Sequence, residues 1–185
     1  MSDDESARVL ESRSVYRGKI LELDIQRIEL PGGKRTDFEL VRHPGAAAIL
    51  PVTATDEVLL LRHYRHATGG WLTEIPAGKL APGEDPTDCA RRECGEETGF
   101  QPRELVSLGW IWTTPGFSDE RIWLFLGRGL ERVESSLEDD EVLRVEAVPL
   151  ERAVTMARGG ELRDAKSVCA LLRLAASKEI SASSS

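Results

Sequence analysis

A short segment punctuated by glycines, residues 78–100, constrains the local fold of this chain more than any other part of the sequence. Asp85 suits a helix N-cap, Pro86 suits the first helical position, and Gly99 suits the left-handed residue just beyond a helix end. These signals predict a helix of about three turns that begins at Pro86 and ends at Thr98.

The predicted helix carries three glutamates close together. Glu93 and Glu97 are four residues apart and therefore stack on one face, and Glu96 lies beside them. Neighbouring carboxylates repel one another, and a divalent cation that prefers oxygen ligands would reverse that penalty. A glutamate-rich helix face is also typical of a simple solvated surface, so the helix alone leaves both interpretations open.

Composition limits the class of protein. With 185 residues, of which 41% are hydrophobic, the chain can bury one good core with a small appended subdomain. No apolar run approaches the roughly 18 residues that a membrane span needs, and the first residues lack a hydrophobic signal core. We therefore expect a soluble cytoplasmic protein that does not associate with membranes.

Charge and cysteine content exclude two further classes. The formal net charge of -8 argues against a broad nucleic-acid surface, which needs clustered Lys and Arg. The odd cysteine count, 3, without CxxC spacing argues against a disulfide framework or a zinc site. A polyanionic small molecule would then have to be held by local cations and metal.

Hydrophobic patterning divides the chain into an N-terminal sheet and a larger mixed region. Alternating runs predict a small antiparallel sheet in residues 1–43, with strands at 9–18, 20–30 and 35–43. The apolar run 46–52 predicts a buried strand, and residues 57–65 predict its hairpin partner. Three more strands are expected, at residues 106–114, 121–130 and 142–148.

The C-terminal part predicts two helices and a tail. One helix starts near Pro149, and the other is capped by Asp164. Residues 177–185 form a polar segment that we expect to be disordered. The expected domain organisation is an N-terminal sheet at 1–43, a main domain at 44–176 and a tail at 177–185, which together make a mixed α/β (α+β) protein.

The segment GKLAPGEDPTDCARRECGEETGF fits the pattern G-x5-E-x7-R-E-U-x-E-E-x-G-U, where U is a bulky apolar residue, at every fixed position. It resembles the Nudix box of the Nudix hydrolase family. Cys94 occupies an apolar position of the box as a small hydrophobe. The resemblance implies an α/β/α sandwich with a mixed sheet, to which the small N-terminal antiparallel sheet is added.

The resemblance also implies a metal site. Glu93 and Glu97 would bind Mg²⁺, with Mn²⁺ as a possible substitute, together with the backbone carbonyl of Ala77. Glu96 would be a further ligand, direct or through water, and Arg92 would orient the carboxylates. For Glu84 and Arg92, a structural salt bridge between loop and helix is an equal alternative.

Segments outside the box, among them VRHPGAAAILPV, LLLRHYRHATGGWLTEIPAGKL, TTPGFSDERIWLFL and RDAKS, resemble the ADP-ribose pyrophosphatase branch of the family. Pro115, downstream of the box, is a mark of that branch. The implied reaction is Mg²⁺-dependent hydrolysis of a nucleoside diphosphate sugar, above all of ADP-ribose to AMP and ribose 5-phosphate. Two alternatives stay open: another substrate such as GDP-mannose or ADP-glucose, and a Nudix ligand-sensing domain without turnover.

Substrate contacts follow from the same resemblance. Arg65 would contact the diphosphate, unless it is simply an exposed charge at a strand end, and Glu120 would lie near the terminal ribose. Trp71 and Phe117 are candidates for packing on a base or sugar, with ordinary core or lid packing as the alternative. The full set of expected substrate-binding residues is Arg65, Glu74, Lys79, Pro115, Gly116, Glu120, Glu39 and Arg42.

A general base is expected in the acidic run at residues 138–141. In the resembled branch this loop carries the carboxylate that activates water, which favours Asp139 as the base and Glu141 as a metal ligand. The family has glutamate where Asp139 stands, and solvated acidic loops are common, so the register stays open. The expected catalytic residues are Glu96, Glu97, Asp139, Glu141 and Arg92.

The N-terminal sheet predicts an assembly. In the resembled branch this sheet exchanges between two subunits, so that each completes the base-binding pocket of its partner. Residues 17–21, with Glu39 and Arg42, match the stretch involved. We therefore expect a homodimer. Arg35 lies two positions from Asp37, where the family arginine is expected, so base recognition is the weakest part of the match.

Overall fold

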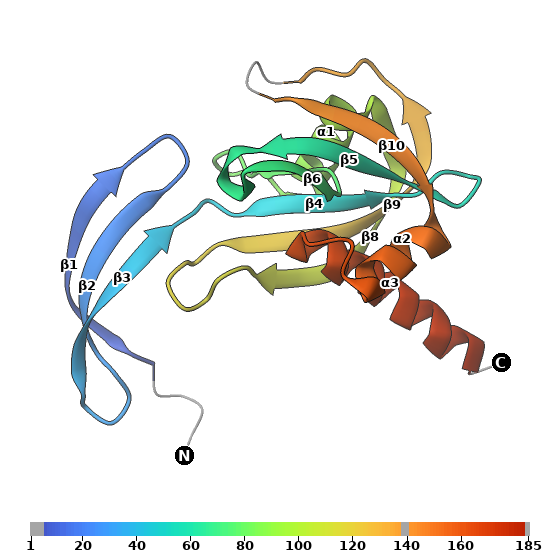
Figure 1. Ribbon diagram of the computed structural model, residues 1–185. Coiled ribbons are helices and arrows are strands. Elements are labelled where there is room, and N and C mark those ends of the chain that lie inside the picture. The colour runs from blue at the N-terminus through green and yellow to red at the C-terminus, as the bar shows by residue number, and fades with distance from the viewer. Residues whose placement is uncertain (1–5, 138–140, 184–185) are drawn as a thin grey trace. The chain divides into compact units, whose positions relative to one another are not determined.

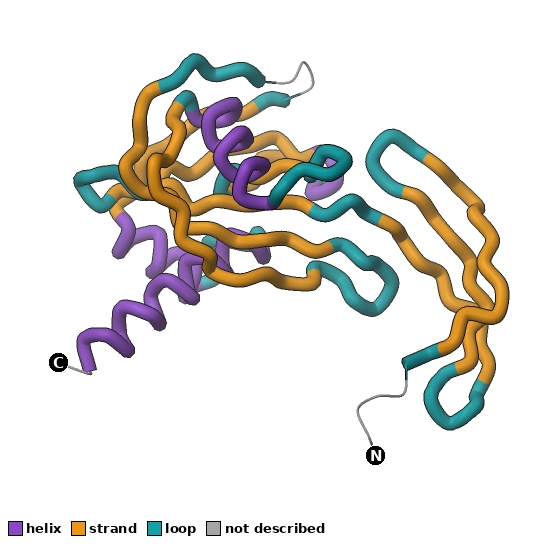
Figure 2. The backbone as a smooth tube through the Cα atoms, turned by 180° about the vertical axis from the view of Figure 1, so that it is seen from behind, coloured by secondary structure: helices purple, strands orange, loops and turns teal. Residues whose placement is uncertain are grey.

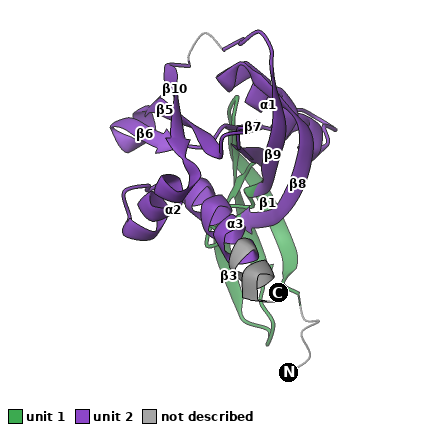
Figure 3. Cartoon of the chain, turned by 90° about the vertical axis from the view of Figure 1, so that its right-hand side faces the viewer, with its two compact units in different colours: residues 1–45, 112–121 green, residues 46–111, 122–185 purple. Residues whose placement is uncertain are grey.

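The structure is a computed structural model that describes residues 6–137 and 141–183. It divides into two compact units, which Figure 3 shows in green and purple. The first unit comprises Met1–Gly45 and Trp112–Arg121. The second unit comprises Ala46–Ile111 and Ile122–Ser185 and carries the helices.

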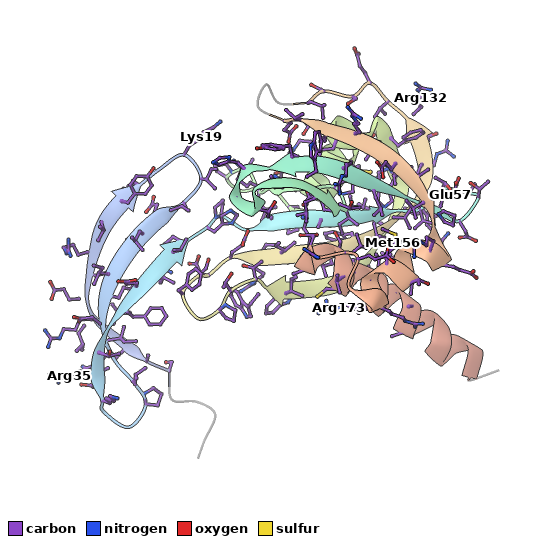
Figure 4. All side chains as sticks on the ribbon, viewed as in Figure 1. Lys19, Arg35, Glu57, Arg132, Met156 and Arg173 are labelled. Atoms are coloured by element: carbon purple, nitrogen blue, oxygen red, sulfur yellow. The ribbon has the colours of Figure 1, made fainter. Side chains whose placement is uncertain are left out.

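The first unit contains a three-stranded antiparallel sheet with the order β1-β2-β3 (Figure 1). Its strands are β1 (Arg8–Arg17), β2 (Glu22–Glu29) and β3 (Arg35–Arg42). Gly32 and Gly33, between β2 and β3, have φ angles of 88° and 85°, a conformation that glycine adopts without steric cost. Arg35 follows this turn and donates from Nε to Oε2 of Glu29 at 2.8 Å (Figure 4).

The second unit contains two sheets. A four-stranded sheet has the order β7-β4-β9-β8, with β4 (Ala46–Pro51), β7 (Ala77–Lys79), β8 (Phe100–Trp112) and β9 (Arg121–Arg132). A three-stranded sheet has the order β10-β5-β6, with β5 (Glu57–Arg65), β6 (Gly70–Glu74) and β10 (Leu143–Pro149). The first of these is mixed, because β4 pairs parallel with β9 and antiparallel with β7.

The predicted hairpin between β4 and β5 is wrong. Both edges of β4 are occupied, by β7 and β9, and both edges of β5 are occupied, by β10 and β6. Between the two strands the structure has a single isolated bridge, from Val52 to Val58. The short connection between them therefore passes the chain from one sheet to the other.

Helices cover both faces of the four-stranded sheet (Figure 2). They are α1 (Pro86–Thr98), α2 (Leu150–Gly159) and α3 (Ala165–Ser183), and a short 3₁₀ turn, η1 (His66–Thr68), follows β5. Alternate residues of β4 point to opposite faces: Ala47 and Ile49 pack in a cluster with Cys89 of α1, whereas Leu50 packs in the core that includes Leu171 of α3. This arrangement confirms the predicted mixed α/β/α sandwich.

The C-terminal helix is longer than expected. We predicted a disordered polar tail over residues 177–185, but α3 continues to Ser183. The segment contains neither Gly nor Pro and includes Lys and Glu, which are good helix formers, so nothing local ends the helix. No helix in the part of the chain that the structure describes is long and apolar enough to cross a membrane.

Candidate active site

Helix α1 has the bounds and caps that its sequence predicts. Oδ1 of Asp85 accepts from the backbone N–H of Thr87 at 2.8 Å, and Gly99 adopts the left-handed conformation with φ of 73°. Cys89 and Cys94 turn into the core, where burial raises the pKa of each thiol to about 12. Glu93 and Glu97 lie against β7, beside Gly78 and Ala77 respectively.

Glu97 is the most deeply buried of these glutamates, with 2% of its surface exposed. Its Oε2 accepts a hydrogen bond from the backbone N–H of Ala77 at 2.8 Å, while its Oε1 is buried and has no hydrogen-bond partner among residues 6–137 and 141–183. Burial raises the pKa of Glu97 to about 9, because the Ala77 bond offsets only part of the desolvation and the charges of Glu93 and Glu141 add to it.

Glu93 lies directly against the backbone of Gly78. A Cβ atom at position 78 would sit 1.9 Å from the carboxyl carbon of Glu93, so only glycine leaves room for this carboxylate. Burial raises the pKa of Glu93 although Arg92 acts in the opposite direction. The first glycine of the box is therefore part of the carboxylate site.

Arg92 connects the glutamates of the box. Nη1 donates to Glu93 at 2.6 Å and to Glu96 at 2.9 Å, and the guanidinium makes a bidentate contact with Glu84 through Nε at 2.9 Å and Nη2 at 3.1 Å. Arg92 lowers the pKa of Glu84 to about 2 through these hydrogen bonds. One arginine thus forms the loop-to-helix salt bridge with Glu84 and also contacts two further carboxylates of the box.

The donor set of this site fits a hard divalent cation. Its side chains offer only carboxylate oxygens, one of which, Oε1 of Glu97, is buried and has no partner among the residues that the structure describes. In the described part of the chain, no three or more His, Cys, Asp or Glu side chains are arranged as a finished metal cage. Arg92 occupies Glu93 and Glu96 in this conformation, so a cation would have to compete with it for their oxygens.

Glu141 is the one residue of the acidic run 138–141 that the structure describes. Its charge raises the pKa of both Glu93 and Glu97. The predicted general base, Asp139, lies outside the described residues.

A second cluster centres on Glu74, at the end of β6. Its carboxylate is 1% exposed and contacts Arg65 Nε at 2.8 Å, Lys166 Nζ at 2.5 Å and His63 Nδ1 at 3.0 Å. Burial opposes ionisation, but these groups, His63 first, lower the pKa of Glu74 to about 2. The carboxylate of Glu74, for which a substrate-binding role was predicted, lies among these protein groups, and Arg65 is the half-exposed member of the cluster.

The other predicted residues of the second unit lie at its surface. Lys79 is exposed, and its carbonyl accepts from Nη2 of Arg92 at 3.3 Å. Trp71 is 42% exposed and packs edge-on against Tyr64, with ring centroids 5.9 Å apart. Sequence reasoning did not assign Lys166 or His63, although Lys166 lies in the RDAKS segment that it singled out.

The remaining predicted residues belong to the first unit. Nη1 of Arg42 donates to Oδ2 of Asp119 at 2.8 Å, and His43 Nδ1 lies 3.6 Å from Oε1 of Glu120. Asp119 also accepts from the His43 backbone N–H at 2.9 Å and so fastens the 112–121 loop to β3, a role that the sequence did not reveal. Three residues with predicted substrate roles, Glu39, Pro115 and Gly116, are exposed.

A hollow of about 460 Å³ lies within the first unit. The turn between β1 and β2 lines one part of it, including Lys19, which Figure 4 labels. Arg42, His43 and Asp119 line another part. The turn overlaps residues 17–21, where the sequence predicted a contribution to base binding.

Comparison with known proteins agrees with this architecture. Residues 41–171 match the family model described as NUDIX domain. An ADP-ribose pyrophosphatase of Bacillus subtilis (strain 168) is 36% identical over 166 residues, covering 89% of this chain and 90% of that protein. A methanol dehydrogenase activator of Bacillus methanolicus is 34% identical with the same coverage.

A solved structure described as an ADP compounds hydrolase superposes with a TM-score of 0.79 and 22% identity, covering 92% of each chain, which supports the fold. The family model spans the carboxylate helix and both sheets of the second unit. On these grounds the chain belongs to the NUDIX hydrolase family, beside the ADP-ribose pyrophosphatase that it resembles over most of its length.

Proposed function

We propose that this protein hydrolyses the diphosphate bond of a nucleoside diphosphate sugar, with ADP-ribose as the main substrate and AMP and ribose 5-phosphate as products. The observation that carries the proposal is the buried Oε1 of Glu97, which has no partner within residues 6–137 and 141–183 and lies on a helix whose Arg92 contacts Glu93 and Glu96. The similarity to an ADP-ribose pyrophosphatase over 89% of the chain supports the substrate class.

Mg²⁺, or Mn²⁺ in its place, is the proposed cofactor. Glu93 and Glu97 would hold it with the carbonyl of Ala77, and Glu96 and Glu141 would complete the ligands. When bound, such a cation neutralises diphosphate charge and lowers the pKa of a coordinated water.

The protein side chains would have separate roles in binding the substrate and in transferring the proton. Arg92 keeps Glu93 and Glu96 oriented, and Arg65 and Lys79 would bind the diphosphate oxygens, which stabilises the charge that develops during phosphoryl transfer. Glu120, with Pro115 and Gly116, would position the terminal sugar. A carboxylate of the 138–141 run, Asp139 or Glu141, would accept the proton of the attacking water.

We also propose a cytoplasmic homodimer. The exposed apolar residues of β1 and its following turn, such as Val9, Tyr16 and Ile20, support an interface with a second copy. Glu39, Arg42 and the turn at residues 17–21 would then take part in base recognition. The three cysteines are unpaired, which fits a reducing compartment.

A phosphate-release assay tests the activity. The protein is incubated with Mg²⁺, alkaline phosphatase and either ADP-ribose, ADP-glucose, GDP-mannose or a dinucleoside polyphosphate, because only the hydrolysis products expose phosphomonoesters. We expect release with ADP-ribose above all, and a loss of at least about 100-fold in Glu97→Gln. Glu104→Gln, which changes an exposed glutamate of β8, is the matched control and should keep full activity.

Ligand sensing without turnover is the second candidate. The observation that favours it is that the carboxylates are not gathered as a metal cage in the described part of the chain. A thermal shift with ADP-ribose together with no release from any substrate, with Mg²⁺ or Mn²⁺, would support it and overturn the hydrolase proposal.

A further inference from the structure

The Glu74 cluster joins segments that are far apart in the sequence. Lys166, at the start of α3, contacts Glu74 from a position 92 residues further along the chain and is itself only 8% exposed. Its Nζ also lies 3.0 Å from Oδ1 of Asp164. The other oxygen of Asp164 accepts from the backbone N–H of Ser167 at 3.0 Å and from the Ser167 hydroxyl.

The same serine ties the helix to the strand end. Oγ of Ser167 accepts from the backbone N–H of Ile75 at 2.8 Å. The first turn of α3 is thereby attached to the end of β6 at two points. Lys166 contacts the side chain of Glu74, and Ser167 accepts from the backbone N–H of the next residue, Ile75. Lys166 therefore contacts Glu74 from a helical turn that the hydrogen bonds of Ser167 hold in place.

The two oxygens of Glu74 have different partners. Oε2 receives Lys166, whereas Oε1 receives Nε of Arg65. Among the residues that the structure describes, Arg65 hydrogen-bonds through Nε alone, which leaves both terminal amino groups of the guanidinium open to an anion. Fixing Oε2 sets the plane of the carboxylate and hence the direction of the Arg65 fork.

We propose that Lys166 is a positioning residue for substrate binding, which acts through Glu74 to hold the guanidinium of Arg65 toward the diphosphate. The inference rests on the proposed function, because it takes Arg65 as a diphosphate ligand. Lys166 itself is buried and touches Glu74 and Asp164, so its effect on substrate passes through these carboxylates.

The charges around Glu74 explain what loss of Lys166 would do. His63 and Arg65 face it from β5, Lys166 faces it from α3 with Asp164 behind, and Glu97 lies on α1 with a pKa that the charge of Glu74 helps to raise. Without the ammonium group, the buried carboxylate keeps Arg65 as its one permanent cation. Protonation of Glu74 then becomes easier, and a protonated Glu74 no longer holds Arg65 by a charge-assisted hydrogen bond.

Steady-state kinetics with ADP-ribose and Mg²⁺ test the proposal. Lys166→Met, which keeps the length of the aliphatic chain, should raise KM about tenfold or more while kcat changes about threefold or less. The ratio of the variant's KM to that of the wild type should also rise as the pH is lowered from about 8 to about 5, because the metal site titrates alike in both proteins and Glu74 does not. Lys34→Met, at an exposed turn between β2 and β3, is the control and should behave as wild type.

A double-mutant cycle shows whether Lys166 acts through Glu74. If it does, adding Lys166→Met to Glu74→Gln should change KM by less than about twofold, because the carboxylate it orients is already gone. Multiplicative effects of the two changes, or an unchanged KM in Lys166→Met, would overturn the proposal. A thermal melt of each variant establishes that it is folded at the assay temperature.

The activity of the wild-type protein distinguishes a failure of the proposed function from a failure of the positioning role of Lys166. If it hydrolyses no nucleotide sugar, the proposed function fails. If it is active and Lys166→Met keeps its KM and pH profile, the hydrolase proposal stands and the positioning role of Lys166 is wrong.

Discussion

Gly78 shows how a single missing side chain can determine the chemistry of a site. Glu93 occupies the volume that a Cβ at this position would need, so the carboxylate and the glycine belong to one structural feature. The backbone of Gly78 lies outside the left-handed region, and what the position requires is space. The position of this glycine in the box pattern thus has a steric explanation, which the spacing of the pattern alone does not reveal.

Gly78→Ala should consequently impair activity without unfolding the protein. The added methyl group displaces the Glu93 carboxylate, and we expect kcat/KM for the preferred nucleotide sugar to fall about 100-fold or more. Gly159→Ala, at the end of α2 where a Cβ meets nothing within 4 Å, is the control. Full activity of Gly78→Ala would mean that the position of Glu93 does not matter for catalysis.

Glu97 illustrates the free-energy cost of the proposed cation site in the metal-free protein. Burial raises the pKa of Glu97 to about 9, so at neutral pH the metal-free folded protein must keep protonated a carboxyl that ionises in the unfolded chain, and this linkage destabilises the folded state. Glutamine has nearly the same shape and is neutral in both states. Glu97→Gln should therefore raise the melting temperature of the metal-free protein by a few degrees, about 1 kcal/mol or more in the free energy of unfolding.

The same variant should lose its response to metal. Added Mg²⁺ or Mn²⁺ should stabilise the wild type by binding to the folded state, and Glu97→Gln lacks a proposed ligand. Calorimetric melts with chelator and with metal measure both effects. A lower melting temperature of Glu97→Gln with chelator would contradict the view that burial of the Glu97 carboxyl destabilises the metal-free protein.

At the scale of elements, local and non-local signals differ in what they reveal. The bounds of α1 could be predicted to the residue because Asp85, Pro86 and Gly99 act on their own neighbourhood. The pairing of β4 could not, because an all-apolar strand shows that both faces are buried and leaves its neighbours open. Its parallel partner β9 lies far along the chain, whereas a short connection suggested β5.

Short strands and buried ion pairs were missed for a related reason. β7 has three residues, and its Ala77–Lys79 sequence shows no alternation by which to recognise a strand. Lys166 resembles any surface lysine until the fold places it beside Glu74. The sequence could indicate the carboxylates of the site, but the contacts that orient them depend on tertiary packing.

The N-cap of α1 is a testable element-scale feature. Asp85→Ala removes the acceptor for the Thr87 N–H and should lower the free energy of unfolding by about 1 kcal/mol. Asp85→Asn keeps a side-chain oxygen at the cap and should cost only a few tenths of a kcal/mol. Urea denaturation of the three proteins measures this order, and equal losses in both variants would show that the carboxylate charge, acting on the helix dipole, matters more than the cap hydrogen bond.

At the scale of the whole molecule, stability and the proposed site share residues. The Glu74 cluster connects β5, β6 and the start of α3, which lie far apart in the chain. The site therefore depends on completion of the fold, since the C-terminal helix supplies Lys166. Acid should therefore weaken the stability of the fold and the proposed site together.

The free energy of unfolding should reveal Glu74 in its pH dependence. The pKa of Glu74 is lowered from 4.5 to about 2 in the folded state, so its ionisation stabilises the protein above pH 4.5, and that contribution is lost as the pH falls toward 2. By linkage the contribution is roughly 3 kcal/mol at most. Glu74→Gln should be less stable than the wild type at pH 7, and the difference should narrow steadily below pH 4.5. Other carboxylates with lowered pKa, such as Glu84, are present in both proteins and cancel in the comparison. Urea denaturation at a series of pH values from 7 to 3 measures the difference, and a gap that stays constant would show that Glu74 is not held ionised by its cluster.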